Sequence, residues 1–445
     1  MLIDFTIENF RSIKSPQTLS LLATSTKEHP ENSFSLSREK KIRLLKSAVI
    51  YGANASGKSN VLKALGTMLT FIKDSTDVKA GHDIPYYQPF KLDKECLAKP
   101  TRFEMEFVCD EIRYRYFVAY TATFIEEEGL YFYPNKIETK LFLRKQGNPI
   151  EFGNALKGAR RGIEEQLLEN VLFLSKAANS NNKALRNIYT SIHNGILIHT
   201  YSSFFSSPTN YMLGTKKLPP SLISQFISTI DTGITEIVST KTEFHKSSMP
   251  NLENYSEDEK TILLESLSFS AKSAHRATGF HEEHIHFNID EESDGTVKSY
   301  ALAGFIFTVI LRGGTLVIDE LNNSLHPIIV RFIIQLFNNE KSNPRNAQLI
   351  FSTHDTTLLD PSLFRRDQIW FTEKNDTGET KLFSMSEFDY KEIRKDTPFS
   401  KWYLSGKFGA IPIVNDFSIL VDEIANAQAK KAERAQDQSK NPHPL

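Results

Sequence analysis

The chain has 445 residues, 40% of them hydrophobic, and its 53 Lys and Arg nearly balance its 54 Asp and Glu, which leaves a net charge of -1. This length predicts two domains or one domain with a large insertion, and the charge balance excludes a global electrostatic attraction to nucleic acid or membranes. The only cysteines, Cys96 and Cys109, exclude a disulfide framework. Residues 1–5 lack the pattern of a secretion signal, and the longest apolar run, residues 300–311, is too short to span a bilayer. We therefore expect a cytoplasmic protein without a membrane segment.

The first element in chain order is a predicted strand. Apolar and polar side chains alternate in residues 1–14, which predicts a strand with one buried face. Residues 15–40 are polar and rich in serine, so we expect a surface loop there.

The next segment, GANASGKS at residues 52–59, matches G-x-x-x-x-G-K-[ST], the loop that wraps nucleotide phosphates. Its glycines let backbone N–H groups face the phosphates, Lys58 supplies a cation toward the β and γ oxygens, and the Ser59 hydroxyl suits Mg²⁺. A predicted buried strand (47–51) precedes the loop, and a predicted helix (61–72) follows it. ATP or GTP, with Mg²⁺, is the predicted ligand. The predicted contacts are Gly52, Asn54, Ala55, Ser56, Gly57, Lys58, Ser59 and Asn60.

Further along the chain, strands give way to helical patterns and then return. Residues 102–118 alternate with period two on both sides of a polar pair, Asp110 and Glu111, which predicts a hairpin. From about 150 to 275, short helical patterns such as 163–174 and 222–237 predict a mainly helical insertion with no motif that we can assign to chemistry. Predicted strands at 314–318 and 348–352 flank a predicted helix at 327–337, and this βαβ unit would complete a nucleotide-binding domain.

Chemically capable side chains follow these last two strands. Asp319 and Glu320 end the first strand; Asp319 would hold Mg²⁺ through water, and Glu320 would polarise the attacking water. The alternative is a buried strand that simply ends at a polar turn. His354 ends the second strand, where a neutral imidazole can donate a hydrogen bond to the γ-phosphate or to the water. The alternative for His354 is a surface histidine.

A small polar turn, residues 292–298, leads into the apolar helix that we expect to begin near Tyr300. Exposed N–H groups at a helix start, beside Ser293 and Lys298, can bind a γ-phosphate. An ordinary N-capped helix explains the same residues equally well.

Taken in order, these pieces resemble the ABC-class ATPase heads of the SMC, RecF and OLD group. The chain is most similar to compact bacterial AAA ATPases of the RloA- or AbiL-like kind, which occur in phage-defence and restriction loci. The resemblance covers residues 1–120 and 285–412, and the helical middle matches in placement only. Its motifs are NFRS (9–12), GANASGKS, the Ser-x-Gly-Thr turn (293–296), LVIDE (316–320), NSLHP (323–327), STHD (352–355) and YLSGKFGAIP (403–412).

The resemblance implies an α/β fold: an ABC-type P-loop ATPase head with a mixed or parallel sheet flanked by helices, an antiparallel β subdomain and a mainly helical insertion. The implied parts are an N-terminal lobe of the head (1–125), the insertion (126–285), a C-terminal lobe of the head (286–415) and a C-terminal helix or tail (416–445).

The resemblance also implies that two heads enclose ATP, with Ser293, Gly295 and Thr296 of one head capping the γ-phosphate on the P-loop of the other. Asn323 and Ser324 would lie at that interface like a D-loop. Such proteins often carry an acidic residue where this chain has Asn322-Asn323, a departure that bears on coupling across the interface.

Two further residues are candidates on the same grounds. Gln88 is the candidate for the Q-loop glutamine at the metal. Arg11 is a candidate nucleotide contact from the first strand; the alternative is a surface arginine.

Two clusters have weaker chemical meaning. His275, His281, His284 and His286 have a spacing that fits a metal site, but no cysteine is near, and a strand leading into the polar turn explains them better. The last residues, from 425 onward, predict a frayed helix or disordered tail. Its basic residues are interrupted by Glu433 and Asp437, which indicates a solvated helix face rather than a nucleic-acid arm.

By family analogy, ATP-dependent dimerisation or hydrolysis would control a separately encoded effector, a nuclease or toxin, in anti-phage defence. The chain carries no nuclease constellation of its own, which favours such a partner. The alternatives are a RecF- or SMC-like DNA-binding repair or recombination ATPase, which the near-neutral charge does not indicate, and a nucleotide-gated scaffold with negligible turnover.

Overall fold

The computed structural model describes residues 1–180, 182–199, 207–231, 233–241, 265, 267–279, 283–389, 397–412 and 417–440. The chain separates into two compact units, Met1–Ala410 and Ile411–Leu445. The first unit contains the nucleotide-binding motifs. The second contains one described helix, α11 (Ser418–Lys440).

The central element of the first unit is a six-stranded sheet. Five of its strands are parallel, and β18 pairs antiparallel at one edge. The middle strands are buried on both faces, as their continuous apolar sequences predict. In order across the sheet, the strands are β11 (Ile196–His199), β15 (Thr315–Ile318), β16 (Gln348–Ser352), β5 (Ser47–Gly52), β17 (Ile369–Lys374) and β18 (Thr380–Ser384).

A seven-stranded antiparallel sheet forms the other layer. The predicted opening strand and hairpin are both confirmed, and the hairpin turns at Asp110 and Glu111, which adopt positive φ of 48° and 62°. In order, the strands are β10 (Glu151–Phe152), β9 (Thr139–Lys145), β8 (Ile125–Phe132), β7 (Ile112–Tyr120), β6 (Thr101–Cys109), β1 (Leu2–Glu8) and β2 (Gln17–Ser20).

The prediction of a plain surface loop over residues 15–40 is wrong in part. β2 pairs with β1 and buries Leu19, and β3 (Ser33–Ser35) pairs with β4 (Arg43–Leu45). The polar and serine-rich composition concealed these strands because β2 is a short edge strand in which only Leu19 is buried.

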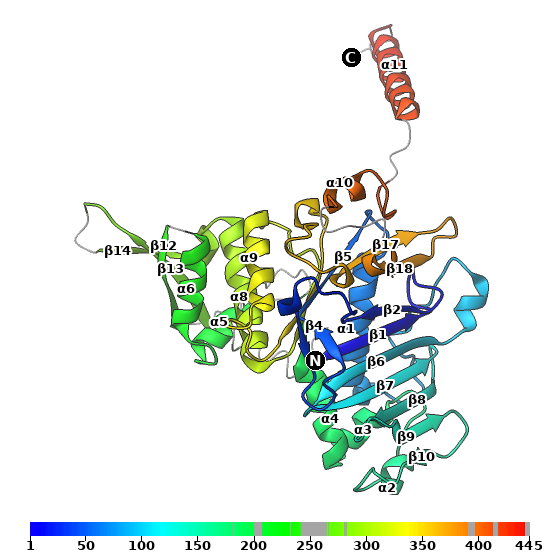
Figure 1. Ribbon diagram of the computed structural model, residues 1–445. Coiled ribbons are helices and arrows are strands. Elements are labelled where there is room, and N and C mark those ends of the chain that lie inside the picture. Colours follow the sequence, from blue (N-terminus) through cyan, green and yellow to red (C-terminus); the bar gives the residue numbers. More distant parts are fainter. Residues whose placement is uncertain are drawn as a thin grey trace, which may run out of the picture. The chain divides into compact units, whose positions relative to one another are not determined.

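Helix α1 (Lys58–Asp74) contacts β5 and β16 of the six-stranded sheet and β1 of the antiparallel sheet, and its apolar side joins the main core. Figure 1 shows α5, α6, α8 and α9 grouped on one side of this unit and the antiparallel strands on the other, with β5 and α1 between them. The other helices are α2 (Arg161–Glu164), α3 (Phe173–Asn179), α4 (Lys183–Gly195), α5 (Ser207–Gly214), α6 (Pro220–Ile230), α8 (Asp294–Arg312), α9 (Pro327–Asn338) and α10 (Phe399–Leu404). Short 3₁₀ helices cover Pro30–Asn32, Ser75–Asp77, Lys94–Ala98, Ile289–Glu291, Thr356–Leu358, Arg366–Gln368 and Met385–Glu387.

The prediction of a mainly helical middle segment needs correction. Its helices exist, but β8, β9 and β10 extend the antiparallel sheet and β11 joins the six-stranded sheet. A separate three-stranded sheet contains β12 (Ile234–Lys241), β13 (Phe269–Arg276) and β14 (His284–Asn288). Residues 234–237, expected at the end of a helix, form a strand because their Ile and Thr side chains favour extended backbone once they pair with β13.

One described helix, α8, is long and apolar enough to cross a membrane, and most of it is buried inside the protein. Residues 300–311, expected to be too short to span a bilayer, thus lie in a helix that is long enough, and its burial places it in the core. Its first turn begins at Asp294, earlier than the expected start near Tyr300.

Candidate functional site

The P-loop joins β5 to α1, and two of its residues have no space for a side chain. A Cβ on Gly52 would lie 2.5 Å from the Ser56 hydroxyl oxygen and from the carbonyl oxygen of Thr372. A Cβ on Gly57, where φ is 116°, would lie 2.2 Å from the Thr380 hydroxyl oxygen. The strands β17 and β18 thus press against the loop, and only glycine permits this approach.

Lys58 is the first residue of α1 and is buried. Its Nζ donates hydrogen bonds to the carbonyl oxygens of Gly52, at 2.9 Å, and Ala53, at 3.0 Å. Burial lowers the pKa of Lys58 to about 8, and the nearby carboxylates of Glu320 and Asp319 oppose that shift. The ammonium therefore lies among the P-loop carbonyls, within the field of the two predicted catalytic-site carboxylates.

Asp319 and Glu320 follow β15 and are held by Ser352, the last residue of β16. The Ser352 hydroxyl donates to Asp319 Oδ1 at 2.6 Å and accepts the N–H of Glu320 at 2.8 Å. Glu320 has a φ of 54°, a left-handed conformation that costs energy in a residue with a side chain. Its carboxylate stays half-exposed, with 50% of the side-chain surface accessible. The turn thus presents one carboxylate to solvent while its neighbour is hydrogen-bonded within the protein.

His354 lies at the same sheet edge, with Nε2 4.0 Å from Glu320 Oε1. Burial lowers the pKa of His354, and the Lys58 ammonium lowers it further. The imidazole is therefore neutral at physiological pH and has one N–H to donate. The structure brings Lys58, Asp319, Glu320 and His354 together at the carboxyl ends of β5, β15 and β16, as the sequence predicts.

The polar turn at the start of α8 is an N-cap. The Ser293 hydroxyl accepts the N–H of Thr296 at 3.2 Å, and the two hydroxyls are 2.9 Å apart. A Cβ on Gly295 would lie 3.2 Å from the carbonyl oxygen of Ser324, so the turn packs against the predicted D-loop-like segment. Asn323 donates its N–H to the Glu320 carbonyl at 3.0 Å. The turn and the Glu320 loop are therefore neighbours in one chain.

Sequence reasoning missed the residues that support this turn. Thr296 donates its hydroxyl to Asp231 Oδ2 at 2.7 Å, and Asp231 Oδ1 accepts the N–H of Gly233 at 3.1 Å. Glu292 accepts hydrogen bonds from His275 Nε2, at 2.7 Å, and from the Ser273 hydroxyl on β13. No sequence pattern marks Asp231, which is 65 residues from Thr296.

The histidine cluster gains no support as a metal site. His275 is paired with Glu292, and the described residues contain no group of three side chains placed to hold a metal ion. His281 lies outside the described residues.

Arg11 and Gln88 contact each other. Arg11 has a φ of 51°, and its Nε donates to Gln88 Oε1 at 2.7 Å. Both line a cavity of about 420 Å³ with Ser12, Asn60 and Lys374. Asn60, in the first turn of α1, donates to the Ser12 hydroxyl at 2.7 Å. Gln88 would have to leave Arg11 before this oxygen could bind Mg²⁺, so its role at the metal, like that of Arg11 at the nucleotide, stays a prediction.

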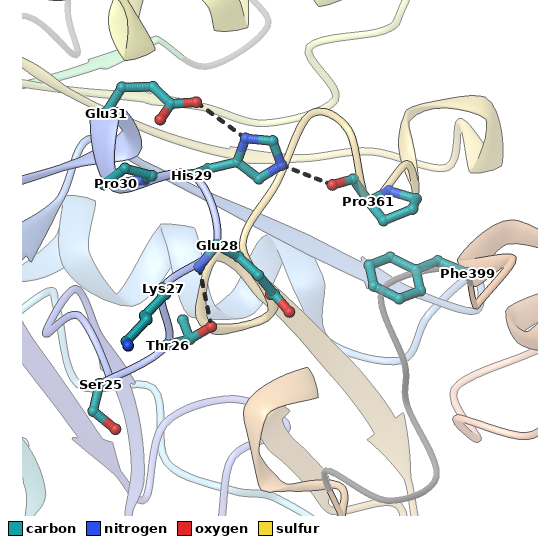
Figure 2. Close-up of a pocket in the computed structure, with 9 residues that line it drawn as sticks. All are labelled: Ser25, Thr26, Lys27, Glu28, His29, Pro30, Glu31, Pro361 and Phe399. Carbon is teal, nitrogen blue, oxygen red and sulfur yellow. Dashed lines mark hydrogen bonds and ion pairs between the residues drawn. The ribbon is translucent and has the colours of Figure 1, made fainter.

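A second cavity, of about 650 Å³, contains none of the predicted site residues. It is lined by residues 25–31, Pro361 and Phe399, and Figure 2 shows His29 between Glu31 and Pro361. The His29 ring nitrogens lie 3.0 Å from Glu31 Oε1 and 2.8 Å from the Pro361 carbonyl oxygen. The volume of this cavity therefore does not locate the nucleotide site; the motif residues at the sheet edge do.

Comparison with known proteins bears on the same motifs. Residues 47–360 match the family described as AAA domain, putative AbiEii toxin, Type IV TA system. The chain belongs to this AAA family. The matched range contains the P-loop, Asp319, Glu320 and His354, so the predicted ATPase class is confirmed. The mixed sheet with its P-loop and the antiparallel layer confirm the predicted fold class.

Other comparisons add similar structures. No curated protein matches this chain. Similar solved structures include an SMC head domain from Thermotoga maritima, with 13% identity, a TM-score of 0.38 and coverage of 86% of this chain and 98% of that one. An SMC head bound to the C-winged helix domain of ScpA has 12% identity, a TM-score of 0.37 and coverage of 88% and 98%. An SMC head with an extended coiled coil, bound to the C-terminal domain of ScpA from Pyrococcus furiosus, has 12% identity, a TM-score of 0.38 and coverage of 86% and 96%.

Proposed function

We propose that this AAA-family ATPase closes two heads around ATP and hydrolyses it to control a separately encoded effector, a nuclease or toxin, in anti-phage defence. The observation that carries the proposal is the meeting of Lys58, Asp319, Glu320 and His354 at one sheet edge. Burial and the Lys58 ammonium lower the pKa of His354, and the Glu320 carboxylate is half-exposed, as their proposed roles require. The link to defence rests on the resemblance to defence-locus ATPases and is the part furthest from the geometry.

In the proposed reaction, the P-loop N–H groups and the Lys58 ammonium bind the β- and γ-phosphates. The Ser59 hydroxyl and the Asp319 carboxylate are oxygen donors of the kind that Mg²⁺ prefers, and they would hold the ion, which supplies charge neutralisation when bound. The exposed Glu320 carboxylate accepts a hydrogen bond from the attacking water and takes its proton as the water oxygen bonds to the γ-phosphorus. The bond from that phosphorus to the β–γ bridging oxygen breaks, and ADP and phosphate result. The neutral His354 donates its N–H to a γ-phosphate oxygen.

A second copy would complete the site. The side-chain hydrogen bonds of Ser293 and Thr296 go to each other and to Asp231, and none of them goes to the P-loop of the same chain. Ser293 is exposed at a helix N-terminus, where backbone N–H groups favour an anion. These properties support a cap that acts on the γ-phosphate of a partner head.

Complementation between two inactive variants tests this arrangement. Lys58→Ala should bind ATP about a hundredfold more weakly at its own P-loop, and Ser293→Arg should bind ATP yet block the opposite head. In a 1:1 mixture, half of the dimers contain one copy of each variant. Each such dimer has one intact site of two, formed by the P-loop of Ser293→Arg and the cap of Lys58→Ala. About a quarter of wild-type turnover should therefore return. Steady-state ATPase assays measure it. Two results would rule out the closure of two heads on ATP. One is full turnover by Ser293→Arg alone, and the other is no recovery of turnover in a mixture shown to contain mixed dimers.

ATP affinity should depend on pH through Lys58. The pKa of Lys58 is lowered to about 8, so the free protein loses this ammonium as the pH rises through 8. Because the phosphates bind the charged form, ATP affinity should be level below pH 8 and fall by about tenfold per pH unit above it. Titration calorimetry from pH 6.5 to 9.5 measures this.

The Lys58→Ala variant is the control for that titration. Its ATP affinity should not begin to fall near pH 8, even though Lys298, whose pKa burial also lowers to about 8, still titrates in this variant. If the ATP affinity of Lys58→Ala fell as much above pH 8, the pH dependence would belong to a group other than Lys58.

Asp231 is proposed to position the cap. Asp231→Asn replaces the anionic acceptor of the Thr296 hydroxyl with a neutral one, and kcat should fall by about fivefold. ATP affinity of the single head should not change. Asp376→Asn, in an exposed loop, is the matched control. If Asp231→Asn and Asp376→Asn lowered kcat equally, Asp231 would have no specific role in positioning the cap.

Effector control is tested separately by recovering native complexes from cells. Glu320→Gln, which should hold ATP, and Lys58→Ala, which should bind it far more weakly, ought to co-purify with different amounts of the effector. Stimulation of turnover by duplex DNA, with no co-purifying protein, would favour the RecF-like alternative instead.

A further inference from the structure

Large apolar side chains are exposed on helix α11 of the second unit and at Phe417, the residue directly before it. The exposed fractions are 71% for Phe417, 62% for Leu420, 49% for Val421 and 51% for Ile424. Spacings of three, four and seven residues place these side chains on one face of the helix. The described part of this unit contains no second helix or strand that could cover them. A face of this kind marks an interaction site.

The heptad positions of α11 indicate what covers this face. Phe417, Ile424 and Lys431 occupy one position of the repeat, and Leu420 and Ala427 occupy the position three residues later. In a parallel pair of these helices, equivalent residues meet, so two Lys431 ammonium groups would meet in the seam. In an antiparallel pair, the two positions meet each other. In the register that aligns Ile424 with Ala427 of the other helix, the aliphatic stem of Lys431 covers Leu420, and Phe417 comes opposite position 434.

Charge on the flank of the helix supports the same pairing. Glu423 and Lys430 are seven residues apart, so both lie on one flank of the seam, and both are exposed. Antiparallel helices bring like flanks together, which places Glu423 of each copy beside Lys430 of the other. A parallel pair would instead bring Glu423 toward Gln428, which carries no charge. Opposed helix dipoles also favour the antiparallel arrangement.

We propose that α11 pairs antiparallel with α11 of a second copy of this chain, and that this pairing needs no nucleotide. The paired helices would tether two heads and raise their effective concentration for each other. The pairing stands on α11 alone, whereas its consequence for turnover rests on the proposed function.

Sedimentation of the full chain without nucleotide tests the pairing. The wild type and Lys58→Ala should both be dimers, and Leu420→Lys/Ile424→Lys should be monomeric. Glu423→Lys turns two symmetry-related attractions into repulsions and should weaken the dimer by about tenfold. The swap Glu423→Lys/Lys430→Glu should restore it. Asp422→Lys, outside the seam, is the matched control.

Three outcomes would overturn the pairing: a monomeric wild type, a swap that restores nothing, or a Leu420→Lys/Ile424→Lys variant that stays dimeric. ATPase assays of Leu420→Lys/Ile424→Lys then test the α11 pairing and the closure of two heads on ATP independently of each other. Turnover per chain should fall at low protein concentration and recover at high concentration. Loss of the dimer with turnover unchanged at every concentration would uphold the α11 pairing and contradict the closure of two heads on ATP.

Discussion

Lys58→Ala is expected to lower ATP affinity by about a hundredfold, which corresponds to roughly 3 kcal/mol, because the β- and γ-phosphates lose a buried, charge-assisted donor. The two carbonyl oxygens that accept the Lys58 ammonium, those of Gly52 and Ala53, would also lose their donor. All activity that depends on ATP should be lost with it. Binding of ATP measured by calorimetry gives the result directly.

Lys63→Ala is the matched control for this variant, since Lys63 lies one turn further along α1 and is exposed. It removes the same side chain from the same helix and should leave ATP affinity unchanged. If Lys58→Ala bound ATP as tightly as Lys63→Ala, the assignment of GANASGKS as the phosphate site would fail.

Glu320→Gln is expected to reduce turnover by on the order of 10²- to 10⁴-fold while ATP still binds, because the amide cannot take the proton of the attacking water. Head dimers formed with ATP should persist in this variant instead of dissociating after hydrolysis. Phosphate release measures the first effect. Sedimentation with ATP measures the second when Glu320→Gln is combined with Leu420→Lys/Ile424→Lys, because the proposed α11 pairing would otherwise keep the chain dimeric without ATP.

The control for Glu320→Gln is Glu340→Gln, which makes the same chemical change at an exposed position beyond the end of α9. Turnover in that variant should equal the wild type. A wild type that binds ATP but shows no more turnover than Glu320→Gln would instead support the nucleotide-gated scaffold, in which closure alone carries the signal.

The turn at Glu320 connects the proposed base with the proposed γ-phosphate cap. Its left-handed backbone turns the carboxylate out of the line of β15, and the Ser352 hydroxyl holds both the Glu320 N–H and Asp319. Asn323 donates its N–H to the Glu320 carbonyl, and Ser324 packs on Gly295 of the cap. A change in the position of the cap would therefore act on the residues that follow the proposed base.

Parts of the candidate site that are local in the chain could be predicted well. The P-loop, Asp319 with Glu320, and His354 each directly follow a buried apolar strand, and parallel strands end at one edge of their sheet. Once the parallel strands are predicted, it follows that these residues lie close together at one edge of the sheet. The hairpin at Asp110 and Glu111 was predictable for the same reason, because alternation and turn chemistry are properties of neighbouring residues.

Other parts failed because long-range pairing overrides local pattern. The middle segment has helical spacing in places, yet β11 becomes a sheet edge only because β15 is there to pair with it. Residues 15–40 look like a loop until β1 accepts β2. Short edge strands such as β2 and β11 carry weak patterns, since few of their side chains are buried.

By itself, then, the sequence predicted a nucleotide ligand and the loop that would hold its phosphates, because phosphate binding requires glycines, a lysine and a hydroxyl at set spacings along one short loop. Only the tertiary structure decided what supports those residues. Asp231, at the end of α6, accepts the hydrogen bond of the Thr296 hydroxyl, and His275, on β13 of the three-stranded sheet, pairs with Glu292. Hydrogen bonds between residues far apart in the sequence depend on how the chain packs, and a local sequence pattern does not show which distant residues come into contact.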